Sequence, residues 1–145
     1  MSNTMAELIV DDLKDTLCLA SGFSASTVRR WSQLGLSYDV VPCIDIKSEG
    51  VQLKKVTNAY EENELTVALD ITHQIMTADS ETTMDAIVCE ILKTLMADTS
   101  RGGRALETSK EQVQAIVTVA GQPEVVQTII LKIRYRNQIK HPDKN

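Results

Sequence analysis

The stretch TSRGGRALE, residues 99–107, places Arg101 and Arg104 on either side of a Gly-Gly pair. A phosphate-binding loop uses glycines, but it leads into a helix N-terminus, where free amides and the helix dipole meet the anion. Here the glycines follow an apolar helical stripe and precede a strand-like segment, which is typical of a turn at positive φ. We therefore predict a turn, with Arg101 and Arg104 as exposed arms that face a neighbouring subunit or solvent.

His73 falls on the apolar face of a predicted strand. A general base needs an orienting carboxylate and a nucleophile within reach, and the sequence names neither partner for it. The acidic groups, Asp11, Asp12 and Asp15 on a helix and Glu61, Glu62 and Glu64 in a loop, do not converge on one pocket and are interpreted as solvated. We expect a core or subunit-contact histidine, no catalytic, cofactor or metal site, and no enzyme.

The composition argues against a general nucleic-acid binder. The chain has 145 residues, a formal net charge of −5 and only 3% aromatic residues. Phosphate binding needs clustered basic residues, and base stacking needs exposed rings in series. Basic residues gather only between Lys132 and Lys144, where Arg134 and Arg136 are candidates for a local subunit or partner contact; the other interpretation is a solvated strand and tail.

Three dispersed cysteines, Cys18, Cys43 and Cys89, lack metal-ligand spacing relative to each other and to the histidines. They predict buried thiols in a reducing compartment. An apolar run of the roughly 20 residues needed to cross a bilayer is absent from the sequence. We expect a soluble, intracellular protein with no cofactor and no membrane partner.

Two amphipathic helices are predicted. The first begins after caps at residues 2–4 and ends near Ser21-Gly22. The second runs from Ser80 to Ala97 with one apolar stripe at helical spacing, consisting of Met84, Ile87, Val88, Ile91, Leu92 and Leu95. Between the helices, the segment from Phe23 to Ser37 fits either a short helix or a loop.

Alternating patterns predict the strands. Residues 40–46 and 51–56 form a hairpin that turns at KSEG, with Pro42 at an edge or bulge, and residues 64–76 form the clearest strand. Residues 111–121 and 125–136 form an antiparallel pair. The order helix, three strands, helix, two strands predicts one α+β domain over residues 1–145: a two-layer sandwich with a mainly antiparallel sheet of four to five strands, two helices on one face, and an exposed tail at 136–145.

One combination of elements has a counterpart in a known family. The strand ELTVALDITHQIM leads to the helix SETTMDAIVCEILKTLMAD, then through TSRGGRALE to two alternating strands that end in IRYRNQIKHPDKN. This arrangement, over about residues 62–145, resembles small phage tail proteins, in particular tail terminators of the minor tail protein U type and the related tail-completion and neck proteins.

The resemblance implies a structural protein of the virion, assembled in the host cytoplasm. It implies a hexameric ring that stops growth of the tail tube, contacts the tube protein and the head connector or a neck protein, and lets DNA pass through its channel. An acidic chain can line such a channel without gripping the DNA. The alternatives are a neck or tail-completion protein, or a small α+β ligand-binding domain in which His73, or Arg101 with Arg104, converges with a carboxylate in a pocket.

Overall fold

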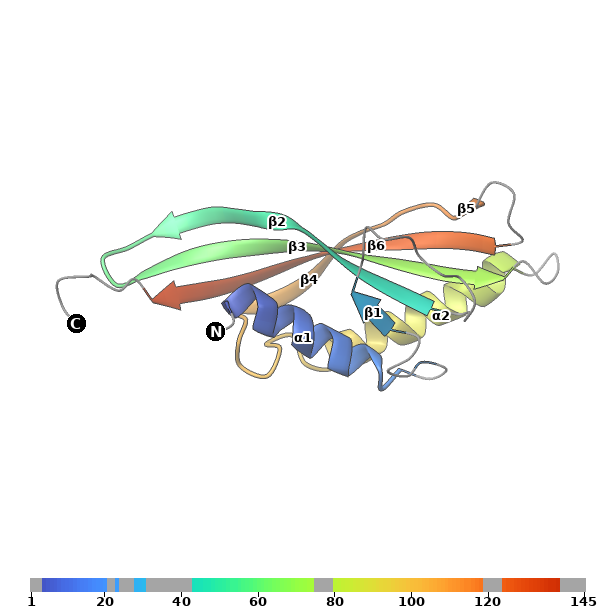
Figure 1. The fold of residues 1–145 in the computed structure, drawn as a ribbon, viewed down its shortest axis with the longest axis horizontal. Coiled ribbons are helices and arrows are strands. Elements are labelled where there is room, and N and C mark those ends of the chain that lie inside the picture. The colour runs from blue at the N-terminus through green and yellow to red at the C-terminus, as the bar shows by residue number, and fades with distance from the viewer. Residues whose placement is uncertain are drawn as a thin grey trace.

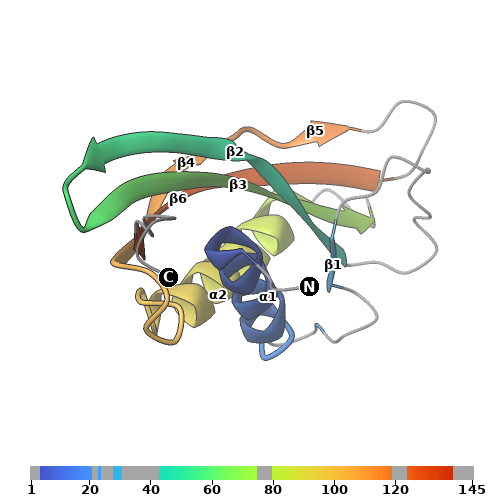
Figure 2. The same ribbon diagram turned by 60° about the vertical axis from the view of Figure 1, so that its left-hand side comes forward.

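The computed structural model describes residues 4–20, 23, 28–30, 43–74, 80–118 and 124–138. The elements, in chain order, are α1 (Met5–Leu17), β1 (Val28–Arg30), β2 (Cys43–Val56), β3 (Tyr60–Gln74), α2 (Ser80–Met96), β4 (Glu107–Val113), β5 (Val117–Thr118) and β6 (Glu124–Gln138). Five strands lie side by side in the order β1-β2-β3-β6-β4, and β5 also pairs with β6. Both helices cover the same face of the sheet (Figures 1 and 2). The predicted α+β sandwich and its order of helices and strands are confirmed.

Strands β3 and β6 form the centre of the sheet. Each is 15 residues long, and the two pair along their whole length. Both alternate as predicted. The helix-facing residues of β3 are buried, as are Ile129, Leu131, Ile133 and Tyr135 of β6. The β3 set is Leu65, Val67, Leu69 and Ile71. This apolar face contacts the buried stripes of the helices and forms one core.

The helices follow their sequence signals closely. Thr4 caps α1 by accepting the Glu7 N–H, and the helix ends at Leu17, earlier than the predicted Ser21-Gly22, which lies outside the described residues. The predicted α2 stripe is confirmed. Met84, Val88, Ile91 and Leu95 are buried, and Ile87 and Leu92 pack against the core.

The hairpin predicted at KSEG is wrong, because β2 continues through it. The pairing of β2 with β3 shifts register between Ser48 and Gly50, where one extra residue is accommodated as a β-bulge. Gly50 has φ of 120°, which a residue with a side chain rarely adopts. The turn instead falls at residues 57–59, where the Thr57 hydroxyl accepts the N–H groups of Ala59 and Tyr60. Pro42 lies outside the described residues.

Other strand boundaries also differ from the predictions. Within the segment 23–37, residues 28–30 form β1, parallel to β2, whereas a helix or loop was expected; Trp31 is not among the described residues. The strand predicted at 111–121 is divided into β4, which begins earlier and ends at Val113, and β5 at Val117–Thr118. Both pair antiparallel with β6, as predicted, and Ala115 and Val117 are exposed. Strand β6 continues to Gln138, so the predicted tail begins inside the sheet.

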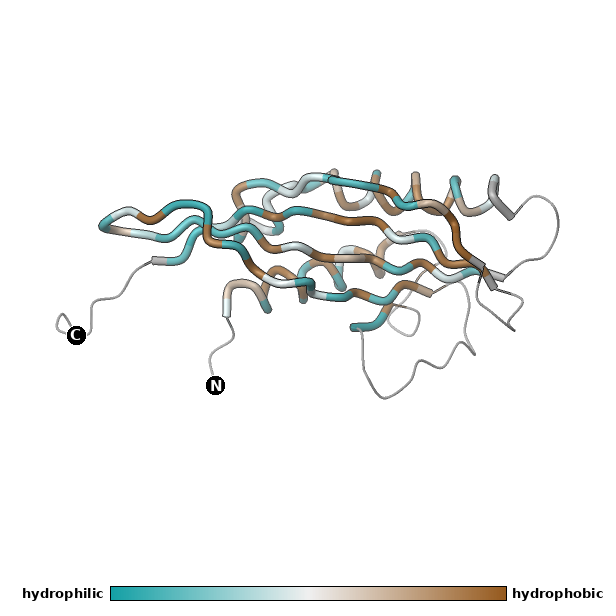
Figure 3. The backbone as a smooth tube through the Cα atoms, turned by 90° about the horizontal axis from the view of Figure 1, so that it is seen from above, coloured by the Kyte–Doolittle hydropathy of each residue, from teal (hydrophilic) through white to brown (hydrophobic). Residues whose placement is uncertain are grey.

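The sheet extends beyond its helices. The hairpin end of β2 and β3, residues 50–64, projects past α1 in Figure 1, and hydrophilic residues dominate it in Figure 3. The first four residues of β2 are buried, whereas those from Ser48 to Val56 are exposed. The helix layer therefore covers one half of β2 and leaves the other half open.

Candidate interaction surface

The loop after α2 is a tight turn, as predicted. Arg101, Gly102 and Gly103 all have positive φ, of 51°, 68° and 86°. The Asp98 carboxylate accepts three hydrogen bonds: from the Ser100 N–H at 3.0 Å, the Ser100 hydroxyl at 2.6 Å and the Gly102 N–H at 2.9 Å. These hydrogen bonds stabilise the carboxylate and lower the pKa of Asp98 to about 2, and the bond from the Ser100 hydroxyl has the largest effect. The amides that would bind a phosphate are thus already occupied by a carboxylate of the chain itself.

Arg101 is buried, with 0% of its side chain exposed. Its guanidinium donates to the carbonyl oxygens of Leu95 and Asp98, at the C-terminal end of α2, and lies 3.5 Å from the carboxylate of Asp12 on α1. Burial lowers the pKa of Arg101, and the nearby Asp12 and Asp98 oppose that shift. Arg101 therefore joins the two helices and the loop.

The prediction of an exposed Arg101 is wrong. The physical reason is that the last carbonyls of a helix have no intrahelical partner, and the turn brings the guanidinium to them. The solvated interpretation of Asp12 is wrong because Asp12 pairs with the buried Arg101 and only 22% of its side chain is exposed, whereas its neighbours Asp11 and Asp15 are confirmed as exposed. Sequence reasoning had one usable signal: an acidic residue on the boundary of the apolar stripe of α1.

Arg104 is an exposed residue, as predicted, with 43% of its side chain accessible, and it lies 3.9 Å from the other oxygen of Asp12. Arg101 and Arg104 thus do converge on a carboxylate, as the ligand-binding alternative required. However, Nη2 of Arg101 donates to the carbonyl of Leu95 in α2 and to that of Asp98 in the loop, so this cluster connects α1, α2 and the loop.

Basic residues of β6 follow the outer face of the sheet, opposite the helices, and are paired with acids. Lys132 lies 3.8 Å from Glu64 and 3.4 Å from Glu111. Arg134, with 46% of its side chain exposed, lies 2.5 Å from Glu107 and 3.7 Å from Glu62. Because these acids balance the basic groups, this face is not the concentrated positive surface that nucleic acids require.

The outer face carries one further contact and corrects one further prediction. Arg136 lies over the ring of Tyr60, 4.4 Å from its centroid, within the range of a cation–π contact. The glutamates at 61, 62 and 64 belong to β3 and are partly buried, so their assignment to a solvated loop is wrong. Arg134 and Arg136 remain exposed, and their role in a subunit or partner contact stays a prediction.

A polar cluster near β1 was not predicted. Asp45 is buried and lies opposite Asp70 in the sheet, 3.3 Å from the Arg29 side chain. Desolvation raises the pKa of Asp45 against the opposing effect of Arg29. The Thr128 hydroxyl donates to Asp70 at 2.7 Å. The only sequence signal for the cluster is a charged residue inside the apolar run CIDIK.

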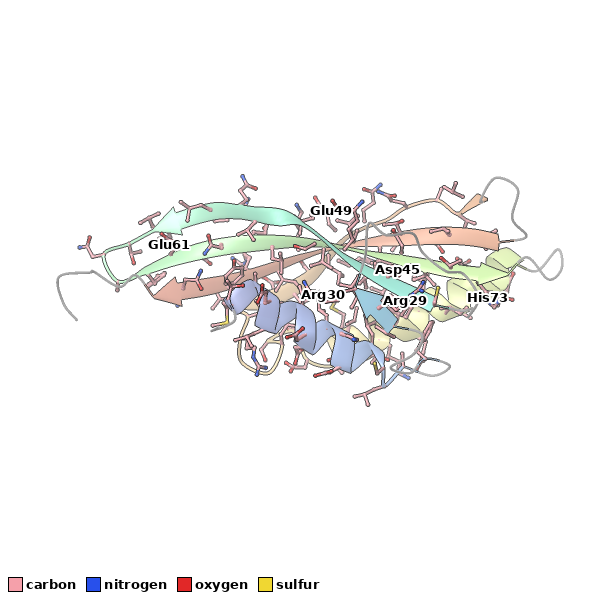
Figure 4. The ribbon with its side chains drawn as sticks, viewed as in Figure 1. Arg29, Arg30, Asp45, Glu49, Glu61 and His73 are labelled. Carbon is pink, nitrogen blue, oxygen red and sulfur yellow. The ribbon has the colours of Figure 1, made fainter. Side chains whose placement is uncertain are left out.

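Cys43 belongs to the same cluster, since the Arg29 Nη2 donates to its Sγ at 3.7 Å. His73 and Glu61 lie at opposite ends of β3, and Asp45 points toward Arg29 (Figure 4). Burial raises the pKa of Cys43, which disfavours the thiolate. The three cysteines are free, but Cys89 is exposed, contrary to prediction. Among the residues with defined positions, clusters of three or more possible metal ligands are absent.

Comparison with known proteins adds a structural likeness. No family model and no curated protein matches the sequence. A chain from the virion of the native gene transfer agent particle superposes with a TM-score of 0.71 at 12% identity, covering 94% of this chain and 100% of the other. At this identity the likeness shows a shared fold. In the part of the chain that the structure describes, neither helix is long and apolar enough to span a membrane.

Proposed function

We propose that this chain is a structural protein of a phage-like virion and that it acts as the tail terminator. The observation that supports this most strongly is the fold shared over nearly the full length of both chains with a component of the gene transfer agent virion. Fold alone does not define function. The proposal is also supported by the chemistry of the cluster at Arg29, where Asp45 pairs with Arg29 and desolvation raises the pKa of Cys43, which disfavours a nucleophilic thiolate.

In this proposal six copies form a ring in the tail region of the virion, after assembly in the host cytoplasm. A ring requires head-to-tail contacts between two different surfaces of the same chain, with a rotation that closes. The ring caps the tail tube, ends its growth and presents a joining surface to the head connector. Arg104, Arg134 and Arg136 are the exposed basic residues proposed for subunit or partner contacts.

The outer face suits a channel through which DNA passes. Its basic side chains Lys132 and Arg134 are balanced by glutamates, and the chain carries a net charge of −5. A channel lined in this way binds phosphates weakly, so DNA moves through without being held. A ring whose lumen proved strongly basic would contradict this part of the proposal.

The test is assembly with the tail tube protein. The purified chain should sediment as a ring, alone or on the ends of tubes, and negative-stain images should show tubes of limited length with a cap. Adding the chain to polymerising tube protein should shorten the tubes. A chain that stays monomeric in both conditions, with unchanged tube length, would sink the proposal.

A neck or tail-completion protein is the second candidate. The likeness is to a virion component without a stated position in the particle, and therefore fits both roles. The two are separated by binding: a terminator binds the end of the tail tube, whereas a neck protein binds the head connector and leaves tube growth unchanged.

A further inference from the structure

We infer that the free edge of β2 in one copy pairs with the free edge of β4 in a second copy, so that the sheet continues from subunit to subunit. The inference rests on the proposed ring and specifies its contact. Two open edges on opposite sides of one sheet are two different surfaces, as a head-to-tail assembly requires.

Both edges are open in the described part of the chain. Strand β1 pairs with β2 at residues 44–46, and within the described residues β2 from Ser48 to Val56 pairs with β3 alone. Strand β4 likewise pairs only with β6. An open edge presents unpaired N–H and C=O groups, which can bind another strand by sheet extension.

The strand directions permit this continuation. Strands β2, β3, β6 and β4 are antiparallel to their neighbours in that order. An even number of alternating strands leaves β4 antiparallel to β2. A second copy placed beside the first in the same orientation therefore brings its β2 antiparallel to β4 of the first, and the alternation is preserved across the contact.

The register also matches the faces. One cross-strand row runs Val51, Leu65, Ile133 and Thr108 on the helix-facing side. The next runs Gln52, Glu64, Arg134 and Glu107 on the outer side. Straight continuation of these rows places Val51 of one copy beside Thr108 of the next, and Gln52 beside Glu107, so the helix layers stay on one side of the extended sheet.

Irregularities confine the contact to a short stretch. In β2 the register shifts occur between Ser48 and Gly50 and between Leu53 and Lys55, so residues 50–53 are regular. In β4 the shift occurs after Lys110, so residues 107–110 are regular. The row matching pairs residues 50–52 of one copy with residues 107–109 of the next. Bulges on both sides then limit further pairing, which also protects the edges from uncontrolled aggregation.

Side chains at the two edges are complementary. Val51 and Leu53 are about half exposed on the β2 edge, and Leu106 is exposed beside the start of β4. Pairing would remove all three from water. The net charges of the two strands are opposite in sign: β2 from Ser48 onward carries two lysines and one glutamate, whereas β4 carries Glu107, Glu111 and Lys110. Lys54, Glu107 and Glu111 also form ion pairs within the chain. This complementarity favours a second copy of the chain as the occupant.

Disulfide trapping tests the register. Cys18 and Cys89 are first replaced by Ser, while the buried Cys43 is kept. In that background Gln52→Cys and Glu107→Cys are made singly, mixed and oxidised. We expect disulfide-linked dimers in the mixture and none in either variant alone. When both changes are in one chain, we expect a series of cross-linked oligomers up to the size of the ring. Leu19→Cys mixed with Glu107→Cys is the control without cross-links, because Leu19 is exposed in the turn after α1 and belongs to neither edge strand.

A second variant tests the same contact if the cysteine variants fail to fold. Leu53→Asp should abolish ring formation and leave the unfolding midpoint nearly unchanged, since Leu53 is 53% exposed. Val117→Asp, also at an exposed apolar residue, should assemble normally. If rings form but positions 52 and 107 do not cross-link in the cysteine variants, or if rings form with Leu53→Asp, the edge contact is wrong and the proposed function stands. Absence of rings and capped tubes in the unmodified chain would overturn the proposed function itself.

Discussion

Arg101 and Arg134 both pair with carboxylates, yet the two regions around them differ in their relation to solvent. Arg101 is fully buried under the end of α2 and bridges to Asp12 on α1. Arg134 lies on the open outer face of β6, where 46% of its side chain is exposed beside Glu107 and Glu62. The same residue type therefore holds the fold together in one region and leaves a surface available in the other.

The difference has an energetic reason. A buried charge that loses its partner remains desolvated and unpaired, whereas an exposed charge that loses its partner is hydrated by water. We therefore expect stability to depend strongly on the Arg101 region and assembly to depend more on the outer face. Three experiments test this contrast.

The largest effect is expected for Arg101→Ala. Removing the guanidinium leaves the carbonyls of Leu95 and Asp98 without this donor and removes one of the two cations beside Asp12. Leaving buried acceptors unsatisfied in this way lowers the free energy of unfolding by about 1–3 kcal/mol. Urea unfolding followed by circular dichroism measures the change.

Arg104→Ala is the matched control, since Arg104 approaches the same Asp12 from a partly exposed position at 3.9 Å. Its effect should stay within about 1 kcal/mol. If both arginine side chains were exposed, both substitutions would be neutral for stability. An unchanged urea midpoint for Arg101→Ala would show that the buried side chain does not contribute to the free energy of unfolding.

An intermediate effect, confined to acid conditions, is expected at Asp98. Its pKa is lowered from 3.8 to about 2 in the folded chain, so the folded state favours the ionised carboxylate. The resulting stabilisation is present above the unfolded value of 3.8 and is lost as the pH falls through about 2. Asp98→Asn should remove this part of the acid dependence.

The carboxyl titration of Asp98, followed by NMR, gives the direct measurement. A midpoint near 3.8 would mean that the bonds from Ser100 and Gly102 do not persist in solution.

The smallest effect on stability is expected for Arg134→Ala. Exposed ion pairs contribute about 0–1 kcal/mol, and salt screens them further. Thermal unfolding at low and high salt should show a small difference that disappears at high salt. Assembly should weaken more than stability if Arg134 contacts a partner. A loss of stability as large as that of Arg101→Ala would abolish the contrast between the two regions.

The sequence predicted those features that depend on local periodicity. The stripe of α2 and the alternation from Leu65 to Ile71 specify which face is apolar, because burial on one face requires a period of 3.6 or 2 residues. The Gly102-Gly103 turn was predicted for the same kind of reason, since positive φ selects glycine locally.

Predictions that required knowledge of distant neighbours were wrong. KSEG contains turn-forming residues, yet pairing with β3 on both sides of Gly50 turns it into a bulge within one strand. The glutamates at 61, 62 and 64 look like a solvated run, and the basic residues of β6, about 70 positions away, make them part of a paired face.

The sequence by itself therefore determined the class of the fold, the apolar faces of the helices and central strands, and the turn after α2, because backbone preference and side-chain period are local properties. Tertiary structure alone decided that Arg101 is buried, that Asp12 is its partner, and that half of β2 extends beyond the helix layer. These outcomes depend on which segments meet in space, and the burial of a side chain is set by its neighbours in the fold.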